Sequence, residues 1–404
     1  MATEIRACTA EEMDAYHRIG SYVFANQDGF DEETTATAPD WTTCAFVDSE
    51  MVATMGTYPF TVRLNGAPVT MGGVTAVGTL PAWRRKGLLR QIMREGLGLC
   101  RDRGQSLAIL YASMGAIYQR FGYGLATTMV TYQFDPRYAG FASPSEAAGS
   151  VRMETPEDAY PVMKRLYVEY ATPRNMFIHR AVPLWQIGIL RPRPKGTPVY
   201  AAVYRDAQGE PRGHVVYQTR EDPALTSGPN QRMEVRDFIA LDMEAYRALW
   251  EYIRRHDLVG QVVMQGCLGV DDPAPDLLLE PRMLNRRTQD GVWMRVVDVQ
   301  KALAARPYGD RGELTISVPA DDMCPWNVGS YLLETDGPTA EVSRRERPAD
   351  LVVDSNALTS LLSGHNTATQ LWRAGKLEAA DAAAALRADR IFRTDHAPHC
   401  PNQF

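Results

Sequence analysis

One stretch, residues 72–90, constrains the fold of this chain more than any other. Small and β-branched residues over 74–80 predict a strand, which Pro81 ends because a proline cannot donate to a β-ladder. From Leu88 onward, apolar residues recur at steps of three and four and predict an amphipathic helix. The turn 84–87 between them reads Arg-Arg-Lys-Gly, so backbone N–H groups, a positive helix end and cationic side chains converge there. Such a turn is typical of a pyrophosphate site.

This turn resembles the acetyl-CoA signature of the GNAT acetyltransferases, which reads Arg/Gln-x-x-Gly-x-Gly/Ala after a strand. Leu89 departs from the last position of that pattern. The alternative is that the basic turn is a solvated helix cap without a ligand. The resemblance implies acetyl-CoA as co-substrate, with the strand N–H of Val77 placed against the thioester carbonyl. It implies cofactor contacts from the strand, the turn and a later strand, at Val77, Thr79, Arg84, Arg85, Gly87, Leu88 and Ser113.

A second motif follows the buried strand predicted over residues 106–113. It begins at Tyr118 and continues with two residues and then an aromatic-Gly-aromatic triplet over 121–123. In the GNAT acetyltransferases, which this motif resembles, that tyrosine protonates the departing thiolate. An ordinary tyrosine pKa of ~10 suits the role, because the side chain stays protonated at neutral pH. The alternative is that Tyr118 merely packs.

Length and charge narrow the classes of function. At 404 residues the chain is too long for one ordinary core, and domains of ~100–200 residues predict two to four of them. The net charge of -6 disfavours nucleic acid as a partner and favours a cationic amine substrate. No apolar run approaches the ~20 residues that a membrane span requires.

The cysteines and the chain start bear on redox state, metals and location. Six cysteines without close pairing argue against a zinc site and a disulfide framework, so we expect reduced and mostly buried thiols. His396, His399 and Cys400 suggest a metal, but two prolines interrupt their spacing and no second cluster completes four ligands, so no metal is expected. The start lacks the shape of a signal peptide, which favours a cytoplasmic location and leaves secretion by a signal-independent route open.

Three domains are predicted, over residues 1–145, 146–292 and 293–404. The first holds both motifs and is expected to be catalytic; two strands, over 51–57 and 60–64, precede a hairpin turn in it. The third begins at Trp293 and ends in helices, with Ser355 or Asn356 capping one helix and another spanning 379–392.

The middle domain repeats the order of the first, with three strands, a helix and a strand. Its joint between strand and helix, residues 241–245, has no proline, paired arginines or glycine. Asp242 and Glu244 stand where a phosphate would sit, and like charges repel. We therefore predict a degenerate copy of the first fold that has lost cofactor binding and serves as scaffold and pocket wall.

The whole chain resembles the Eis (enhanced intracellular survival) family of bacterial acetyltransferases. The match rests on motifs in every part of the chain: residues 77–90, residues 112–124, Trp293-Met294-Arg295, Ala349-Asp350-Leu351 and the ending from Cys400 to Phe404. The resemblance implies an α/β (α+β) fold class, with two GNAT folds in tandem, one active and one degenerate, and a C-terminal sterol-carrier-protein-like domain. It also implies a homo-hexamer that acetylates amines of aminoglycosides, polyamines or lysine side chains.

The resemblance further implies a role for the chain end, where the C-terminal carboxylate on Phe404 reaches the first domain's active site and helps to deprotonate the amine. Tyr118 and Phe404 are thus the expected catalytic residues. Transfer is expected to be direct, in a ternary complex, because no cysteine sits beside a histidine in either motif to suggest an acyl-enzyme. Tyr111 and Ala76 differ from some family members, which bears on the choice of amine. The alternative function is a non-catalytic scaffold or an apolar-ligand-binding protein.

Overall fold

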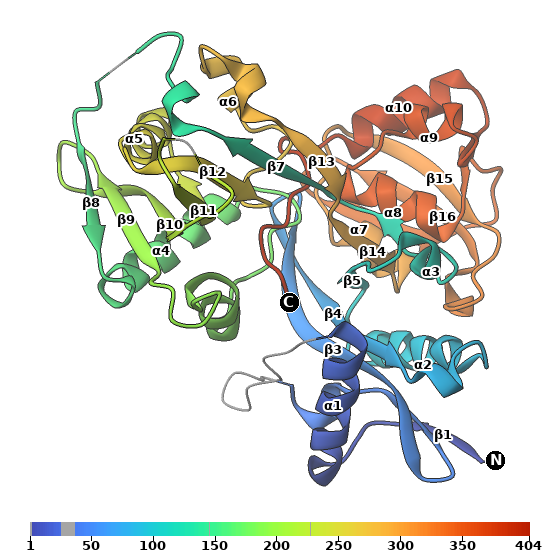
Figure 1. Ribbon diagram of the computed structural model, residues 1–404. Coiled ribbons are helices and arrows are strands. Elements are labelled where there is room, and N and C mark those ends of the chain that lie inside the picture. The colour runs from blue at the N-terminus through green and yellow to red at the C-terminus, as the bar shows by residue number, and fades with distance from the viewer. Residues whose placement is uncertain (1, 26–36, 145, 227) are drawn as a thin grey trace. The chain divides into compact units, whose positions relative to one another are not determined.

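The computed structural model describes residues 2–25, 37–144, 146–226 and 228–404. They form three β-sheets with helices packed on them (Figure 1). The chain divides into two compact units. The first contains residues 1–127, 291–395 and 404, and the second contains residues 128–290 and 396–403.

The first unit contains a seven-stranded sheet and a five-stranded sheet. In sheet order the seven strands are β1 (Thr3–Arg6), β2 (Cys44–Val47), β3 (Glu50–Leu64), β4 (Ala67–Thr79), β5 (Leu107–Tyr111), β14 (Val292–Val296) and β6 (Gly124–Leu125). β1 to β4 pair antiparallel, whereas β5 runs parallel to β4 after the crossover helix α2 (Leu88–Asp102). The predicted strand-turn-helix-strand unit is therefore present at the centre of this sheet.

β3 is one continuous strand of 15 residues, so the prediction of two separate strands was wrong. Pro59 does not interrupt it, because β2 pairs with β3 only as far as Ala53, with one further bridge at Gly56. Beyond that point β3 needs donors toward β4 alone, and a proline is tolerated on an edge. Asn65 and Gly66, with φ of 50° and 89°, form the predicted tight turn into β4.

Helices cover both faces of this sheet. Cys44 and Phe46 of β2 pack in one apolar cluster with α1 (Met13–Phe24), whereas Ala45 and Val47 pack in another with α2. Because successive strand residues point to opposite faces, α1 and α2 lie on opposite sides of the sheet. The short helix α3 (Gly115–Gln119) follows β5.

The five-stranded sheet of the first unit has the order β17 (Ala340–Arg344), β16 (Gly329–Thr335), β15 (Gly312–Val318), β18 (Leu351–Val353) and β19 (Leu377–Ala379). Its helices are α7 (Val299–Ala304), α8 (Ser355–Ser363), α9 (Ala368–Arg373) and α10 (Ala382–Phe392). Asp354, not Ser355 or Asn356, caps α8 by accepting from Ala357 N at 2.7 Å. α10 starts later than predicted because Ala379 pairs with Leu351 in the sheet.

The five-stranded sheet region and the first sheet share a close contact at α8. A Cβ on Gly124 would lie 2.2 Å from the carbonyl oxygen of Asn356, so only glycine allows this approach. Asn356 Nδ2 in turn donates to the carbonyl oxygen of Tyr123 at 2.6 Å. Gly124, which directly follows the aromatic-Gly-aromatic triplet, thus has a packing role.

The second unit contains a seven-stranded sheet that repeats the first. In sheet order its strands are β13 (Arg287–Asp290), β7 (Thr128–Phe134), β12 (Val259–Gln265), β11 (Gln231–Ala240), β10 (Pro211–Glu221), β9 (Tyr200–Arg205) and β8 (Ser150–Glu154). β11 and β12 are parallel and joined by α5 (Met243–Arg254), as β4 and β5 are by α2. The helices α4 (Pro156–Ala171) and α6 (Ala274–Leu277) complete this unit.

The observed units differ from the predicted ranges 1–145, 146–292 and 293–404. β7, which the prediction placed in the first domain, pairs with β12 of the second unit. β14, which the prediction placed in the third domain, pairs with β5 of the first sheet. The tail 396–403 belongs to the second unit and not with the residues before it. The differences have one cause: β7, β14 and the tail each pack against segments that are distant in the sequence.

All six cysteines are free and buried, as expected. Within the part of the chain that the structure describes, no helix is long and apolar enough to cross a membrane.

Candidate active site

β4 and β5 separate in the middle of the first sheet. They pair only over Met71–Gly73 and Leu107–Ile109, and each then continues without pairing to the other. The predicted cofactor contacts Val77 and Thr79 lie on β4 beyond this pairing, and Ser113 follows the end of β5. The strand ends beyond Gly73 are therefore the place to look for reacting groups.

β4 carries a β-bulge at this point. Its register against β3 jumps between Thr75 and Gly78, so Ala76 and Val77 lie opposite a single residue of β3. Ala76 takes a positive φ of 49°, in the left-handed region that non-glycine residues seldom occupy. Because a bulge removes backbone groups from the regular ladder, the backbone at Val77 is available for another partner.

A cavity of about 290 Å³ opens at the bulge. The lining residues are Tyr16, Phe24, Thr37, Tyr58, Val74, Thr75, Ala76, Val77, Leu110, Tyr111, Ser113, Tyr118 and Phe404. No side chain among these described residues carries a formal charge. The Phe404 ring packs edge-on against Phe60 at 5.0 Å between centroids and tilted against Tyr111 at 5.6 Å. Four predicted site residues, Val77, Ser113, Tyr118 and Phe404, thus come together around one cavity.

Tyr118 reaches this cavity from α3, just after β5, and its side chain is 6% exposed. Burial raises its pKa above the ordinary value, because a phenolate would lose its hydration there, and a hydrogen bond with Ser113 opposes that shift. The hydroxyl therefore holds its proton at neutral pH and can donate it.

The predicted pyrophosphate turn lies at the far end of β4. Arg84, Arg85, Lys86 and Gly87 are all exposed, and Gly87 has φ of 82° at the N-cap of α2. In the described residues no side chain caps this helix end, and its first turn holds no acidic residue. Its backbone N–H groups and positive end are thus available to an anion.

The predicted contacts divide between these two places. Arg84 Nε donates to the carbonyl oxygen of Thr79 at 3.0 Å, which folds the guanidinium back over the end of β4. The Leu88 side chain is buried in the core of the sheet, so only its backbone can meet a cofactor. Thr79, Arg84, Arg85, Gly87 and Leu88 thus cluster at the turn.

Replacing Gly87 with valine is expected to weaken acetyl-CoA binding by roughly 10- to 100-fold, the loss of one charge-assisted hydrogen bond. A Cβ there would meet nothing within 4 Å, so the harm comes from the φ of 82° and from the added bulk facing the ligand. The matched control is Gly98→Ala in the same helix, where the space is also open. Calorimetry with acetyl-CoA measures both, and wild-type affinity in Gly87→Val would remove the turn from the cofactor site.

The corresponding turn of the second unit is built differently. Asp242 caps α5 by accepting from Ala245 N at 2.8 Å, and it also pairs with Arg212 at 2.9 Å. Glu244 adds a second carboxylate to the first turn. A carboxylate of the chain thus occupies the helix end where a phosphate would bind, in agreement with the prediction that this copy does not hold the cofactor.

Three family models match consecutive parts of the chain. Residues 4–126 and 177–296 each match an acetyltransferase (GNAT) domain, and residues 299–401 match a sterol carrier protein domain. The predicted fold class, two GNAT folds followed by a sterol-carrier-protein-like domain, is confirmed.

Relatives align with most of the chain. An uncharacterized N-acetyltransferase of Streptomyces avermitilis is 31% identical over 91% of this chain and 89% of its own length. N-acetyltransferase Eis of Mycobacterium tuberculosis is 29% identical over 80% of this chain and 78% of its own. The crystal structure of Eis1 from Mycobacterium abscessus superposes with a TM-score of 0.86 at 29% identity, with 100% of both chains covered. The chain belongs to the Eis family of GNAT acetyltransferases.

Membership of the Eis family makes this protein an acyltransferase with acetyl-CoA as co-substrate. Among the residues that the structure describes, no group of three or more His, Cys, Asp or Glu side chains is placed to hold a metal ion.

The tail of this Eis-family protein is anchored in the second unit by a buried polar network. Asn402 Oδ1 accepts from Arg180 Nε at 2.7 Å, and Asn402 Nδ2 donates to the Tyr167 hydroxyl at 2.8 Å. Arg180 forms a buried ion pair with Asp237 at 2.7 Å, and His214 bonds the same carboxylate at 2.9 Å. Burial by itself would raise the pKa of Asp237, but the Arg180 charge and the hydrogen bond with His214 outweigh it and hold the pKa well below its usual range.

The change Asn402→Ala is expected to lower the free energy of unfolding by about 1–3 kcal/mol, because Arg180 Nε would remain buried without its acceptor. Gln403→Ala is the matched control, since Gln403 is exposed. Thermal unfolding of the full chain, at roughly 2–4 °C per kcal/mol, measures both. Equal melting temperatures in the two variants would contradict the anchoring role.

Two tyrosines of the cavity were missed by the sequence analysis. Tyr16 is buried on α1, and its hydroxyl has no hydrogen-bond partner among the described residues. Tyr58 on β3 shares a hydrogen bond of 2.6 Å with Thr37. Tyr16 lies in a run of apolar residues at helical spacing, and such periodicity shows that a residue is buried but not that its polar end faces a cavity.

Proposed function

We propose that this Eis-family protein transfers the acetyl group of acetyl-CoA directly to a primary amine in a ternary complex. The observation that carries the proposal is the single cavity in the first unit shared by Val77, Ser113, Tyr118 and Phe404. In the proposed reaction the neutral amine attacks the thioester carbon and forms the N–C bond, the C–S bond breaks, the nitrogen gives up one proton, and the thiolate takes a proton from Tyr118.

Val77 is the proposed donor to the carbonyl oxygen as negative charge develops on it. The bulge at Ala76 and Val77 supports this role, since it takes backbone groups out of ladder pairing beside the cavity. A fixed N–H donor needs no reorganisation during the reaction, which is why such donors stabilise a tetrahedral intermediate.

Tyr118 is the proposed acid that protonates the leaving thiolate. Its burial, its raised pKa and its position just after β5 support this role. Ser113, which hydrogen-bonds Tyr118, would orient the hydroxyl toward the sulfur.

Phe404 carries the proposed base, its terminal carboxylate, which takes a proton from the substrate ammonium and so leaves a neutral amine that can attack. The described side chains that line the cavity are uncharged, so the terminal carboxylate of Phe404 would act there without a competing side-chain carboxylate. The aromatic lining, with Tyr16, Tyr58 and Tyr111, favours an organic cation through cation–π attraction. We therefore propose polyamines, aminoglycoside-like amines and lysine side chains as the substrate class.

The experiment that tests the function is a free-thiol assay with acetyl-CoA and a panel of aminoglycosides, polyamines and lysine peptides. We expect thiol release above the rate of acetyl-CoA alone for at least one class of amine. No release across the panel would favour the non-catalytic scaffold. A homo-hexamer and a cytoplasmic location stay predictions, to be checked by light scattering and by cell fractionation.

A further inference from the structure

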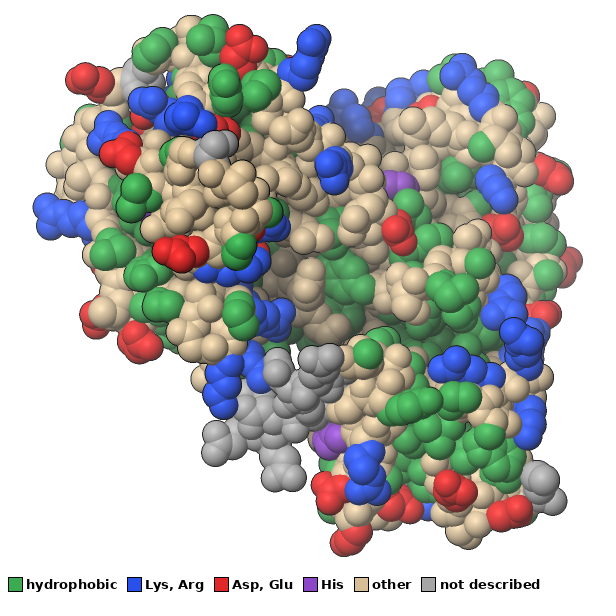
Figure 2. All heavy atoms as spheres, viewed as in Figure 1, with side chains coloured by type: hydrophobic (Ala, Val, Ile, Leu, Met, Phe, Trp, Pro, Cys, Tyr) green, Lys and Arg blue, Asp and Glu red, His purple; other side chains and the backbone are tan. Residues whose placement is uncertain are grey.

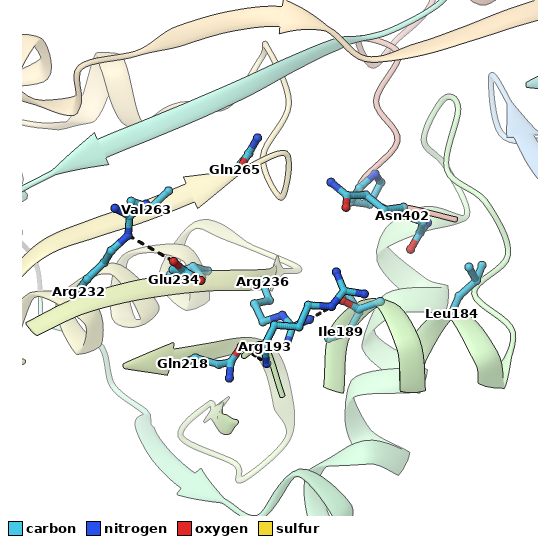
Figure 3. A pocket seen from close by; sticks show the side chains of 14 residues that line it. Leu184, Ile189, Arg193, Gln218, Arg232, Glu234, Arg236, Val263, Gln265 and Asn402 are labelled. Atoms are coloured by element: carbon cyan, nitrogen blue, oxygen red, sulfur yellow. Dashed lines mark hydrogen bonds and ion pairs between the residues drawn. The ribbon is translucent and has the colours of Figure 1, made fainter. Parts of the chain in front are cut away.

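A second cavity, of about 240 Å³, lies wholly within the second unit (Figure 3). Strands β11 and β12 form its floor, and the π-helical turn Leu184–Leu190 and the tail residues 401–403 border it. Arg193, Arg232 and Arg236 line it, whereas Glu234 is the one carboxylate among its described lining residues. The cavity is therefore cationic, although the chain as a whole has a net charge of -6.

Arg236 reaches this cavity because of a second β-bulge. Val216 of β10 pairs with Asp237 of β11, but the next residue, Tyr217, pairs with Val235, so Arg236 is the extra residue. Bulges are found beside functional sites, where they redirect a side chain. The bulge of β4, at Ala76 and Val77, occupies the matching strand of the first unit and borders the proposed acetyl-transfer site.

The guanidinium of Arg236 is fixed by neutral acceptors. It donates to Gln218 Oε1 at 3.1 Å and to the carbonyl oxygen of Gly188 at 3.0 Å, and also to the carbonyl oxygen of Arg191. Arg193 donates in the same way to the carbonyl oxygen of Ile187 at 2.9 Å. Carbonyl and amide oxygens hold these cations in place without neutralising them.

Within the described residues, no carboxylate lies at ion-pair distance from Arg193 or Arg236. Glu234 is already engaged, by Arg232 at 3.3 Å and by Arg220 at 3.1 Å. Burial and the nearby Arg193 charge lower the pKa of Arg236 to about 10. Two unneutralised cations facing one cavity repel each other, and an anion between them would remove that repulsion.

We infer that this cavity binds a small organic anion through a carboxylate or phosphate group held by Arg193 and Arg236. Planar guanidinium groups match the oxygen pairs of both anions. Gln265 and Gln403 line the remainder and supply amide groups for the body of the ligand. Cavities for drug-sized ligands measure roughly 300–1,000 Å³, so 240 Å³ suits a smaller molecule.

The site is distinct from the cofactor turn of a GNAT fold. In this unit that turn is the start of α5, where Asp242 already caps the helix. On the face of the molecule drawn in Figure 2, basic and acidic side chains are intermixed and do not form one basic stripe. Among the described residues of the cavity itself, three arginines face a single carboxylate, Glu234.

Calorimetry of the full chain with inorganic phosphate, and separately with succinate, tests this inference. We expect saturable binding of at least one probe, weakened roughly 10- to 100-fold by Arg236→Gln and by Arg193→Gln, each of which removes a charge-assisted hydrogen bond. Arg165→Gln is the matched control, since Arg165 is exposed on α4 outside the cavity and pairs only loosely, at 4.0 Å, with Glu210. Binding of one probe alone identifies the group that is recognised.

Arg84→Gln separates this site from the turn of the first unit, which also attracts phosphate. We expect Arg84→Gln to leave succinate binding unchanged. Phosphate that binds at the turn would be lost in Arg84→Gln but kept in Arg193→Gln and Arg236→Gln. Failure of both probes to bind the wild type overturns the inference, as does unchanged affinity in Arg193→Gln and Arg236→Gln. Because Arg193 is exposed, its variant tests the site even if Arg236→Gln unfolds the protein.

Discussion

Replacing Tyr118 with phenylalanine is expected to lower kcat by ~10²–10⁴-fold, the usual contribution of a general acid, and to leave acetyl-CoA affinity close to that of the wild type. The ring stays, so its packing against Tyr123, at 5.9 Å between centroids, stays with it. What is lost is the proton for the leaving thiolate. Steady-state kinetics by thiol release, with calorimetry for acetyl-CoA, measure the two quantities separately.

Tyr123→Phe is the matched control for this prediction. Tyr123 belongs to the same motif and is fully buried, but its hydroxyl donates to Met93 Sδ at 3.6 Å and does not line the cavity. Its loss is expected to leave kcat within a few-fold of the wild type. Equal turnover in Tyr118→Phe and Tyr123→Phe would mean that both tyrosines only pack.

Local patterns predicted the individual elements of the fold well. α2 begins at Leu88, where the sequence analysis placed the start of a helix, and β5 lies within the strand predicted over residues 106–113. The spacing of apolar residues and the flanking turn residues that mark these elements are encoded within a few positions. The repeat of three strands, a helix and a strand is likewise a local property, and the two GNAT family matches confirm it.

Pairings between distant segments were not predictable in the same way. β7 directly follows β6 of the first sheet in the sequence, yet it pairs with β12. β14 pairs with β5, although all the strands of the second unit's sheet lie between them in the sequence. A strand's own residues show that it needs partners, but not which of several exposed edges supplies them. For the same reason the tail 396–403 was assigned to the third domain, although Asn402 bonds Arg180.

Candidate site residues could be named from the sequence where a motif marks them. The turn at Gly87 and the tyrosine at position 118 each have a signature, whereas Tyr16 and Arg236 have none. Tyr16 is one position in an ordinary helical stripe, and Arg236 depends on a bulge that a single strand sequence does not reveal. Residues that act through backbone irregularity are thus the ones that require a structure.

Adding three residues after Phe404 is expected to lower kcat by ~10²–10⁴-fold, the range for a lost general base, because the added peptide bond removes the terminal carboxylate that we propose as proton acceptor. The side chain of Phe404 is unchanged by this extension. The same three residues added at the N-terminus are the control. Thiol-release kinetics and a melting curve of each form separate loss of catalysis from loss of folding.

Phe404→Ala distinguishes the carboxylate from the ring that positions it. This variant keeps a terminal carboxylate but loses the contacts with Phe60 and Tyr111, which are worth about 0.5–1.5 kcal/mol for each aromatic pair beyond burial. We expect kcat to fall less than in the extended form, since the group that takes the proton is present but held less firmly. If the extended form with an unchanged melting temperature turned over at the wild-type rate, the carboxylate would have no catalytic part. If Phe404→Ala were as impaired as the extension, the ring would be the essential group at this position.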